Sequence, residues 1–170
     1  DYLIDQYVQN GHFISAFNLY EEMQEEGILP NKSTIFMHLL KACQGLGVEC
    51  LDKAMLIHYH IITHGFELDE ATGSSLLILY AKCGSIKEAQ NVFDILPDRN
   101  IVSWGAMITG YAHLDYGSVA LQLFREMQKN NIKPNRVIYL SVLKACANVG
   151  VIDQGEAIHN QILASGLDLE

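Results

Sequence analysis

A block of this sequence recurs after about one hundred residues, which restricts the chain to folds built from repeated units. Lys41-Ala42-Cys43 returns as Lys144-Ala145-Cys146, and Pro30-Asn31 returns 104 residues later as Pro134-Asn135. With 49% hydrophobic residues against 18% charged ones, the chain is also too apolar for a disordered segment. The sequence therefore predicts a folded repeat protein.

Shorter segments within the block share one pattern of small and apolar residues. Gly11, Ala16, Tyr20 and Met23 match two later sets, which are Gly84, Ala89, Phe93 and Leu96, and Asp115, Ala120, Phe124 and Met127. Offsets of four and three residues place side chains on one face of a helix. Another apolar stretch precedes each glycine or aspartate and carries a tyrosine: Tyr7, Tyr80 or Tyr111. The unit is thus predicted to be helix, short turn, helix, with the turn at a residue that tolerates the left-handed conformation.

We expect one domain over 1–170 with five such units, at 1–31, 32–69, 70–100, 101–135 and 136–170, the first lacking its opening residues. Pro30, Pro97 and Pro134 are expected to stop the second helices, and Ser85 to Glu88 predicts a capping box. A unit of about 35 residues cannot bury its apolar face alone, so neighbouring units must stack. The predicted fold is an all-α solenoid.

Three stretches resemble the pentatricopeptide repeats (PPR) of plants: residues 74–84, residues 101–108 and Phe124-Arg125-Glu126-Met127. The alternation of units resembles the PLS subclass, with P motifs at 1–31 and 101–135, L motifs at 32–69 and 136–170, and a 31-residue S motif at 70–100. The resemblance implies a right-handed α-solenoid of about five PPR motifs. It also implies a module that binds single-stranded RNA, one base per repeat, and specifies sites of RNA editing or processing in plastids or mitochondria.

The resemblance also implies which residues contact RNA. In the family, the fifth and last residues of a motif hydrogen-bond the base, and the second residues of adjacent motifs flank it. In motif 70–100, Ser74 and Asn100 are then expected to read adenine between Ala71 and Val102, with Lys82 on phosphate. Without the family, Ser74 and Asn100 would be ordinary helix-cap or turn residues.

The other motifs give weaker expectations from the same resemblance. In motif 101–135 the last residue is Asn135, the fifth is Gly105, which has no side chain to donate, and Val137 is the next flanking residue. The first motif ends at Asn31. The L motifs carry Met37 and Leu140 at the fifth place; such apolar positions choose bases weakly and often engage editing cofactor proteins.

The net charge of −9 weighs against RNA, because neutralising phosphate supplies much of the affinity of nucleic-acid binders. The alternative is a protein-interaction scaffold that binds editing cofactors, or another copy of itself, through L motifs or solenoid ends. An acidic run in the second helix of the first unit is expected on the outer, solvated face; it comprises Glu21, Glu22, Glu25 and Glu26.

No catalytic residue, metal site or cofactor is expected. The sequence lacks the H-x-E and C-x-x-C pair of zinc deaminases and the glycine-rich phosphate loops. His60 and His64 are four residues apart, as zinc ligands can be, but packing histidines are the stronger interpretation. Trp104 is expected in the core rather than as a stacking platform. The four cysteines form no C-x-x-C pair, which favours reduced, buried thiols, and no apolar run reaches the roughly 20 residues that span a bilayer.

Overall fold

The computed structural model describes residues 2–28, 34–46, 50–66 and 68–166, and every regular element in these ranges is an α-helix. The helices are α1 (Tyr2–Gln9), α2 (Phe13–Glu25), α3 (Thr34–Leu46), α4 (Leu51–Thr63), α5 (Glu70–Lys82), α6 (Ile86–Ile95), α7 (Ile101–His113), α8 (Gly117–Lys129), α9 (Arg136–Val149) and α10 (Ile152–Ser165). None of these helices is long and apolar enough to cross a bilayer.

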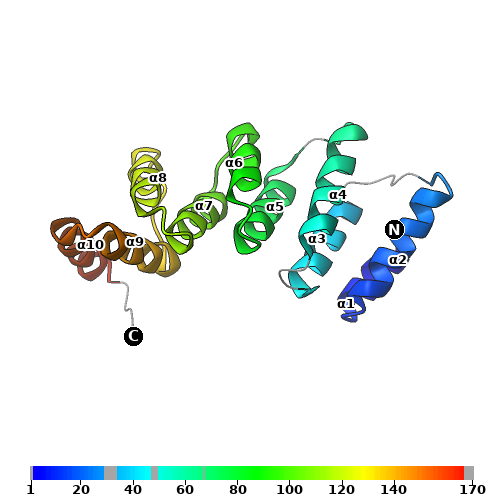
Figure 1. Ribbon diagram of the computed structural model, residues 1–170, viewed down its shortest axis with the longest axis horizontal. Helices are drawn as coiled ribbons and strands as arrows, with labels where there is room; N and C mark the ends of the chain where they lie inside the picture. Colours follow the sequence, from blue (N-terminus) through cyan, green and yellow to red (C-terminus); the bar gives the residue numbers. More distant parts are fainter. Residues whose placement is uncertain (1, 29–33, 47–49, 67, 167–170) are drawn as a thin grey trace.

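Consecutive helices form antiparallel hairpins that stack side by side along one axis (Figure 1). The odd-numbered helices pack on one another in a continuous inner row, from α1 through α3, α5 and α7 to α9. Each even-numbered helix packs on its own partner or on the first helix of the next hairpin, which places it in the outer layer. The predicted right-handed α-solenoid is confirmed.

In three hairpins the turn uses the residue that the sequence pattern singled out, and the turn between α3 and α4 lies outside the described residues. Gly11, Gly84 and Asp115 have positive φ angles of 76°, 75° and 62°. After the turn at Gly84, the N–H of Ser85 donates to the carbonyl of Tyr80 at 2.8 Å, and the turn at Asp115 repeats this bond from Tyr116 to Tyr111 at 2.9 Å. This left-handed cap satisfies carbonyls at the end of the first helix and reverses the chain. The prediction of these turns is confirmed, including the one at an aspartate.

The predicted capping box at Ser85 is wrong. Ser85 does precede α6, but its ψ angle is 61° and its side chain makes no cap hydrogen bond. Side-chain caps occur instead where the backbone is extended, at Asp69, Asn100 and Asn135, with ψ angles of 165°, 178° and 178°. The left-handed residue before Ser85 leaves no extended N-cap, so the hydroxyl does not face the first free N–H groups.

Proline stops one second helix but not another. Pro97 directly follows Leu96, which is extended with ψ 127°, and α6 has only 10 residues, whereas α8 has 13. By contrast, α8 ends before Asn131, a left-handed residue with φ 60°. Pro134 therefore lies after the end of the helix and does not cause it. Pro30 lies outside the described residues.

The short helix α6 differs from its neighbours in the hydrogen bonds between outer helices. Side chains bridge α2 to α4, where the Tyr20 hydroxyl lies 2.6 Å from Nδ1 of His60, and α8 to α10, where Arg125 donates to Gln154 at 3.0 Å. Within the described residues, no hydrogen bond joins α6 to α4 or to α8.

The core lies between the two layers and continues from hairpin to hairpin. Trp104 is 2% exposed and packs edge-on against Phe93 with ring centroids 4.9 Å apart, so its predicted core position is confirmed. The thiols of Cys43, Cys50 and Cys146 are buried, as expected for free cysteines that act as small apolar groups.

Candidate nucleic-acid interface

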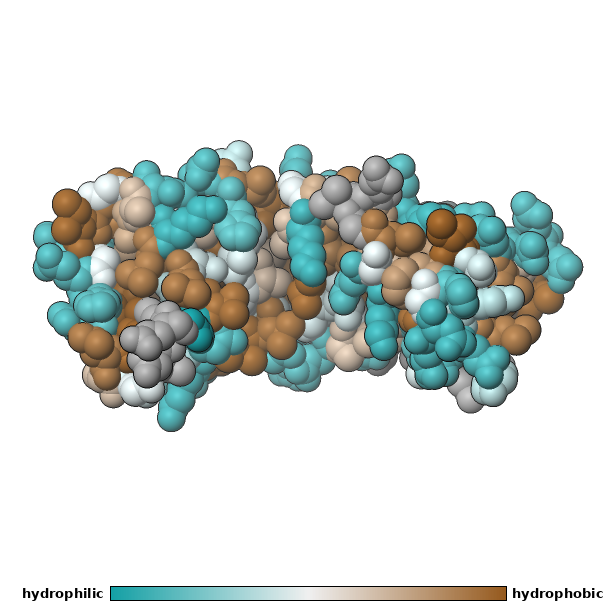
Figure 2. Space-filling view, turned by 90° about the horizontal axis from the view of Figure 1, so that it is seen from below, coloured by the Kyte–Doolittle hydropathy of each residue, from teal (hydrophilic) through white to brown (hydrophobic). Residues whose placement is uncertain are grey.

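The inner row of helices presents one continuous face. On α7 this face carries Val102, Thr109 and His113, spaced so that they lie on one side of the helix, and Ala71 and Lys82 occupy the matching places on α5. Figure 2 shows the molecule from below, with apolar surface widest in the half that holds the C-terminal hairpins. The residues that the family resemblance implies for RNA contact on α5 and α7, such as Ala71 and Val102, lie on this face, which we call the groove.

A pocket of about 370 Å³ opens where α5, α7 and α9 meet. It joins five of the predicted contact residues, which are Lys82, Val102, Gly105, Asn135 and Val137. Val102 and Val137 are 44% and 59% exposed, so both side chains offer apolar surface to a ligand.

The polar groups of the pocket lie at its edges. Asn135 caps α9 through its Oδ1, which accepts from the N–H of Ile138 at 3.0 Å. Its Nδ2 makes no hydrogen bond within the described residues, so both N–H groups of the amide are available. Lys82 and His113 stand at the ends of α5 and α7 and are the basic side chains of the lining.

Gly105 leaves the floor of the pocket bare. A Cβ at this position would lie 3.4 Å from the Ile138 side chain, an ordinary contact. The pocket therefore has room for a larger residue at the place where the family carries a base-reading side chain.

The preceding site, at Ser74 and Asn100, is more closed. Ser74 is 6% exposed, and its Oγ has no hydrogen-bond partner within the described residues. The Oδ1 of Asn100 accepts from the N–H groups of Val102 and Ser103 at 2.8 and 2.9 Å, and its Nδ2 donates to the Glu70 carboxylate. Asn100 is thus a helix cap, as residue types alone suggested, and both ends of its amide are engaged.

The remaining predicted residues that the structure describes do not line the pocket. Ala71 is exposed on α5, and Asn31 lies outside the described residues. Met37 is half-buried and Leu140 is 47% exposed on the first helices of their units. Sequence reasoning missed Glu70 and His113, although each could have been found by aligning the units, since Glu70 opens its unit and His113 takes the place of Lys82.

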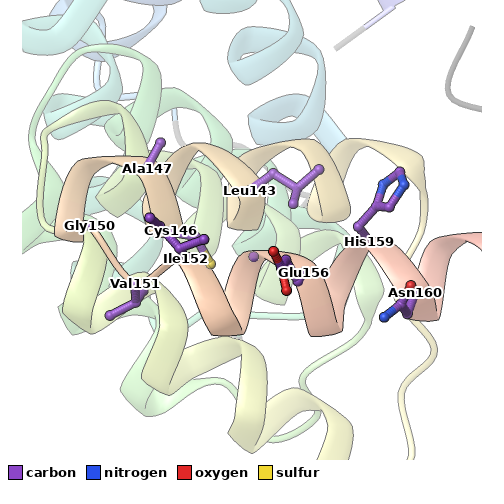
Figure 3. A pocket seen from close by; sticks show the side chains of 10 residues that line it. Leu143, Cys146, Ala147, Gly150, Val151, Ile152, Glu156, His159 and Asn160 are labelled. Atoms are coloured by element: carbon purple, nitrogen blue, oxygen red, sulfur yellow. The ribbon is translucent and has the colours of Figure 1, made fainter.

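A second hollow, of about 780 Å³, lies between α9 and α10 at the C-terminal end of the stack (Figure 3). Its lining is largely apolar, with Leu143, Cys146 and Val151, and carries Glu156 and His159 on α10. In the preceding hairpin the corresponding surface, between α7 and α8, is covered by α9. The end of the stack thus leaves open a surface that the interior hairpins bury.

The histidines of α4 serve packing. Nδ1 of His58 lies 3.0 Å from the Tyr80 hydroxyl, and Nδ1 of His60 contacts Tyr20. Burial lowers the pKa of both histidines, and the nearby His64 lowers that of His60 further. Burial also raises the pKa of Tyr20 and Tyr80 to about 12, so both tyrosines keep their protons. Within the described residues, no group of three potential metal ligands comes together.

The paired helices, the continuous inner row and the open groove define a helical-repeat protein of the α-solenoid class. The model of the PPR repeat family matches residues 99–148, and the PPR repeat model matches residues 2–28 and 74–101. The chain belongs to the PPR repeat family.

Relatives in Arabidopsis thaliana carry the same repeats. One pentatricopeptide repeat-containing protein is 43% identical over 96% of this chain, and a chloroplastic one is 38% identical over 99%. A mitochondrial one is 35% identical over 90% of the chain. The chain spans only 24%, 31% and 27% of the lengths of these three proteins.

Solved PPR structures share the fold. The PPR domain of Arabidopsis protein-only RNase P 1, solved in complex with tRNA, matches with a TM-score of 0.84 at 16% identity, over 98% of this chain and 89% of that domain. The protein PPR10, solved with an 18-nt psaJ RNA element, matches with a TM-score of 0.75 at 19% identity, over 99% of this chain and 25% of PPR10.

Proposed function

We propose that this chain is a module that binds single-stranded RNA in the groove of its inner helices. The observation that carries the proposal is the pocket at α5, α7 and α9, because it brings together residues predicted from separate motifs. The tRNA and psaJ RNA bound by the structural neighbours support the same function.

The pocket suits an unpaired base. Val102 and Val137 stand on two neighbouring helices, and a flat base between them would cover both exposed side chains. The free N–H groups of Asn135 would donate to acceptors on the base edge, and Lys82 would lie near the phosphate. Such a site acts by binding alone, so we propose no enzymatic activity for this segment.

Substitution of a pocket valine tests the proposal. Val137→Glu places a carboxylate in the pocket and should weaken binding of a fluorescent oligoadenylate by at least about fivefold, since base stacking is worth ~1–3 kcal/mol. Val119→Glu on the outer helix α8 is the control, because it adds the same charge at a residue that is 37% exposed. Equal binding by the two variants would refute the pocket as an RNA site.

Several finer features belong to this proposal. The units at 1–31, 32–69, 70–100, 101–135 and 136–170 are taken as P, L, S, P and L motifs, and the RNA role as specifying sites of editing or processing. The chloroplastic and mitochondrial relatives support an organelle as the place of action. Cross-linking of the protein to RNA in intact plant cells, followed by separation of plastids, mitochondria and cytosol, would test this. RNA cross-links confined to the cytosol would refute it.

A protein-interaction scaffold is the second candidate, and the net charge of −9 together with the exposed Leu140 on α9 favours it. In this role the L motifs bind an editing cofactor or a second copy of the chain. Retention of a partner after RNase treatment, lost on Leu140→Glu, would support this role.

A further inference from the structure

We propose that Glu70 restrains base recognition at the Ser74–Asn100 site by holding the Asn100 side-chain amide. The inference rests on the proposed RNA function and adds a residue that controls it. Nδ2 of Asn100 donates to a carboxylate oxygen of Glu70, which joins the start of α7 to the start of α5.

The restraint follows from counting hydrogen bonds. The Oδ1 of Asn100 already accepts two backbone N–H groups of α7, so it has no free acceptor site. Of its two N–H donors, one is held by Glu70. A base that uses this amide must compete with a charge-assisted hydrogen bond, which is stronger than one between neutral groups. It must also bring its phosphates toward a negative charge.

The chain contains an unrestrained version of the same arrangement one unit later. Asn135 caps α9 as Asn100 caps α7, but Ile101 stands where Glu70 stands, as the first residue of its unit. An isoleucine cannot accept a hydrogen bond, and Nδ2 of Asn135 has no partner within the described residues. The open pocket occurs at this unit, beside Ile101 and Asn135.

The restraint has a consequence for changing the base preference. By family resemblance, Asn100→Asp should move the preference of the unit from adenine toward guanine. In this structure that substitution would face the Glu70 carboxylate with a second carboxylate, and like charges at such a distance repel. The change of preference should therefore require Glu70 to be replaced as well.

Two substitutions separate charge from hydrogen bonding. Glu70→Gln removes the charge but keeps an acceptor for Asn100, whereas Glu70→Ile removes both and copies Ile101. Binding of fluorescent oligoadenylate and oligouridylate is measured by anisotropy for each protein. Both variants lose the charge of Glu70, so both should bind the two RNAs more tightly and to the same extent. Only Glu70→Ile releases Asn100. In this variant the ratio of oligoadenylate to oligouridylate affinity should rise about fivefold, the effect of roughly one net hydrogen bond.

The outcomes are distinguishable. An equal adenine-to-uracil ratio in wild type and Glu70→Ile would overturn the restraint while leaving the RNA function intact. Failure of every variant to bind either RNA would overturn the RNA function and the restraint together. In a Glu70→Ile background, Asn100→Asp should favour oligoguanylate over oligoadenylate, whereas Asn100→Asp alone should not. A full change of preference by Asn100→Asp alone would also contradict the restraint.

A measurement without RNA checks the contact itself. The NMR signals of the Asn100 side-chain amide should differ between the wild type and Glu70→Ile, because the substitution removes the acceptor of its N–H group. The side-chain signals of Asn135 provide the internal comparison and should stay unchanged, since Asn135 does not contact Glu70. Unchanged Asn100 signals in Glu70→Ile would overturn the proposal.

Discussion

The asparagines at the starts of α7 and α9 have two roles that use the same side-chain amide, which are to cap the helix and, as proposed here, to contact a base. The Oδ1 of Asn100 accepts two backbone N–H groups and that of Asn135 accepts one, which stabilises each helix. At position 100 this leaves only the Nδ2 donors of the asparagine for a ligand. The interpretation as a helix cap and the interpretation as a base reader are compatible, because they use opposite ends of the amide.

Gly105→Ser is predicted to add base selection to the open pocket. The new residue would give unit 101–135 the pair of serine and asparagine that Ser74 and Asn100 form in unit 70–100, so adenine should be preferred. Because the added Cβ lies 3.4 Å from Ile138, the fold should accept it. The affinity for oligoadenylate should rise by about fivefold, the effect of one net hydrogen bond, as measured by anisotropy.

Gly105→Ala is the matched control, since it adds the Cβ without the hydroxyl. Equal adenine binding by the serine and alanine variants would mean that the fifth residue of the unit does not contact the base. A loss of RNA binding in both variants would instead show that any side chain at position 105 blocks the pocket.

Among the elements, the approach of α8 to α9 depends on one glycine. A Cβ on Gly117 would lie 2.7 Å from the carbonyl oxygen of Ala145 and 2.7 Å from Cγ2 of Val149, so the two helices would have to separate. Gly117→Ala should lower the free energy of unfolding by about 1–3 kcal/mol, the usual cost of overpacking. Urea unfolding followed by circular dichroism measures this.

Gly155 on α10 provides the comparison. Its Cβ would meet only Cys146, at 3.7 Å, so Gly155→Ala should stabilise the helix by about 0.8–1.0 kcal/mol. If both substitutions moved the urea midpoint in the same direction, the close approach at Gly117 would not be the cause of its effect.

Two histidines of α4 should make the free energy of unfolding depend on pH. His58 and His60 have lowered pKa values in the folded state, because burial disfavours their charged forms. Below the ordinary histidine pKa of about 6.5 the unfolded chain binds more protons than the folded one. Their contribution to stability is therefore present above about pH 6.5 and lost as the pH falls toward the folded-state pKa values.

The urea concentration at the unfolding midpoint should consequently be lower at about pH 5.5 than at about pH 7.5, two values on either side of the ordinary histidine pKa. A variant with His58→Gln and His60→Gln should lose less than the wild type over the same interval. Equal losses would assign the pH dependence to other groups.

The helices and turns could be predicted from the sequence better than the hydrogen bonds of individual side chains. Recurring glycines and the aspartate at Asp115 located the turns, because a left-handed residue ends a helix for local reasons. The capping box failed because it depends on the ψ angle of Ser85, which the preceding turn decides. The side-chain hydrogen bond from Asn100 to Glu70 joins residues 30 positions apart, so no local sequence pattern predicts it. The residues of the candidate site remain a prediction, while the open pocket at Val137 and the engaged amide of Asn100 depend on packing between units.

At the scale of the whole molecule, the charge of −9 opposes a polyanion, and few basic side chains lie in the groove pocket. RNA binding by this chain should be weak, because the negative charge of the protein repels the phosphates. It should also fall steeply with added salt, because each phosphate contact releases counterions. Filter binding with an adenine-containing oligonucleotide at low and moderate salt measures the slope. Tight binding that ignores salt would contradict this prediction.

The short helix α6 has a consequence for how the stack can bend. Side-chain bridges join α2 to α4 and α8 to α10, whereas in the part of the chain that the structure describes no side-chain hydrogen bond joins α6 to α4 or to α8. We therefore predict that bending which spreads the outer layer begins around α6. A strand lying along the inner helices would then change the curvature of the molecule first in the unit that contains Ser74.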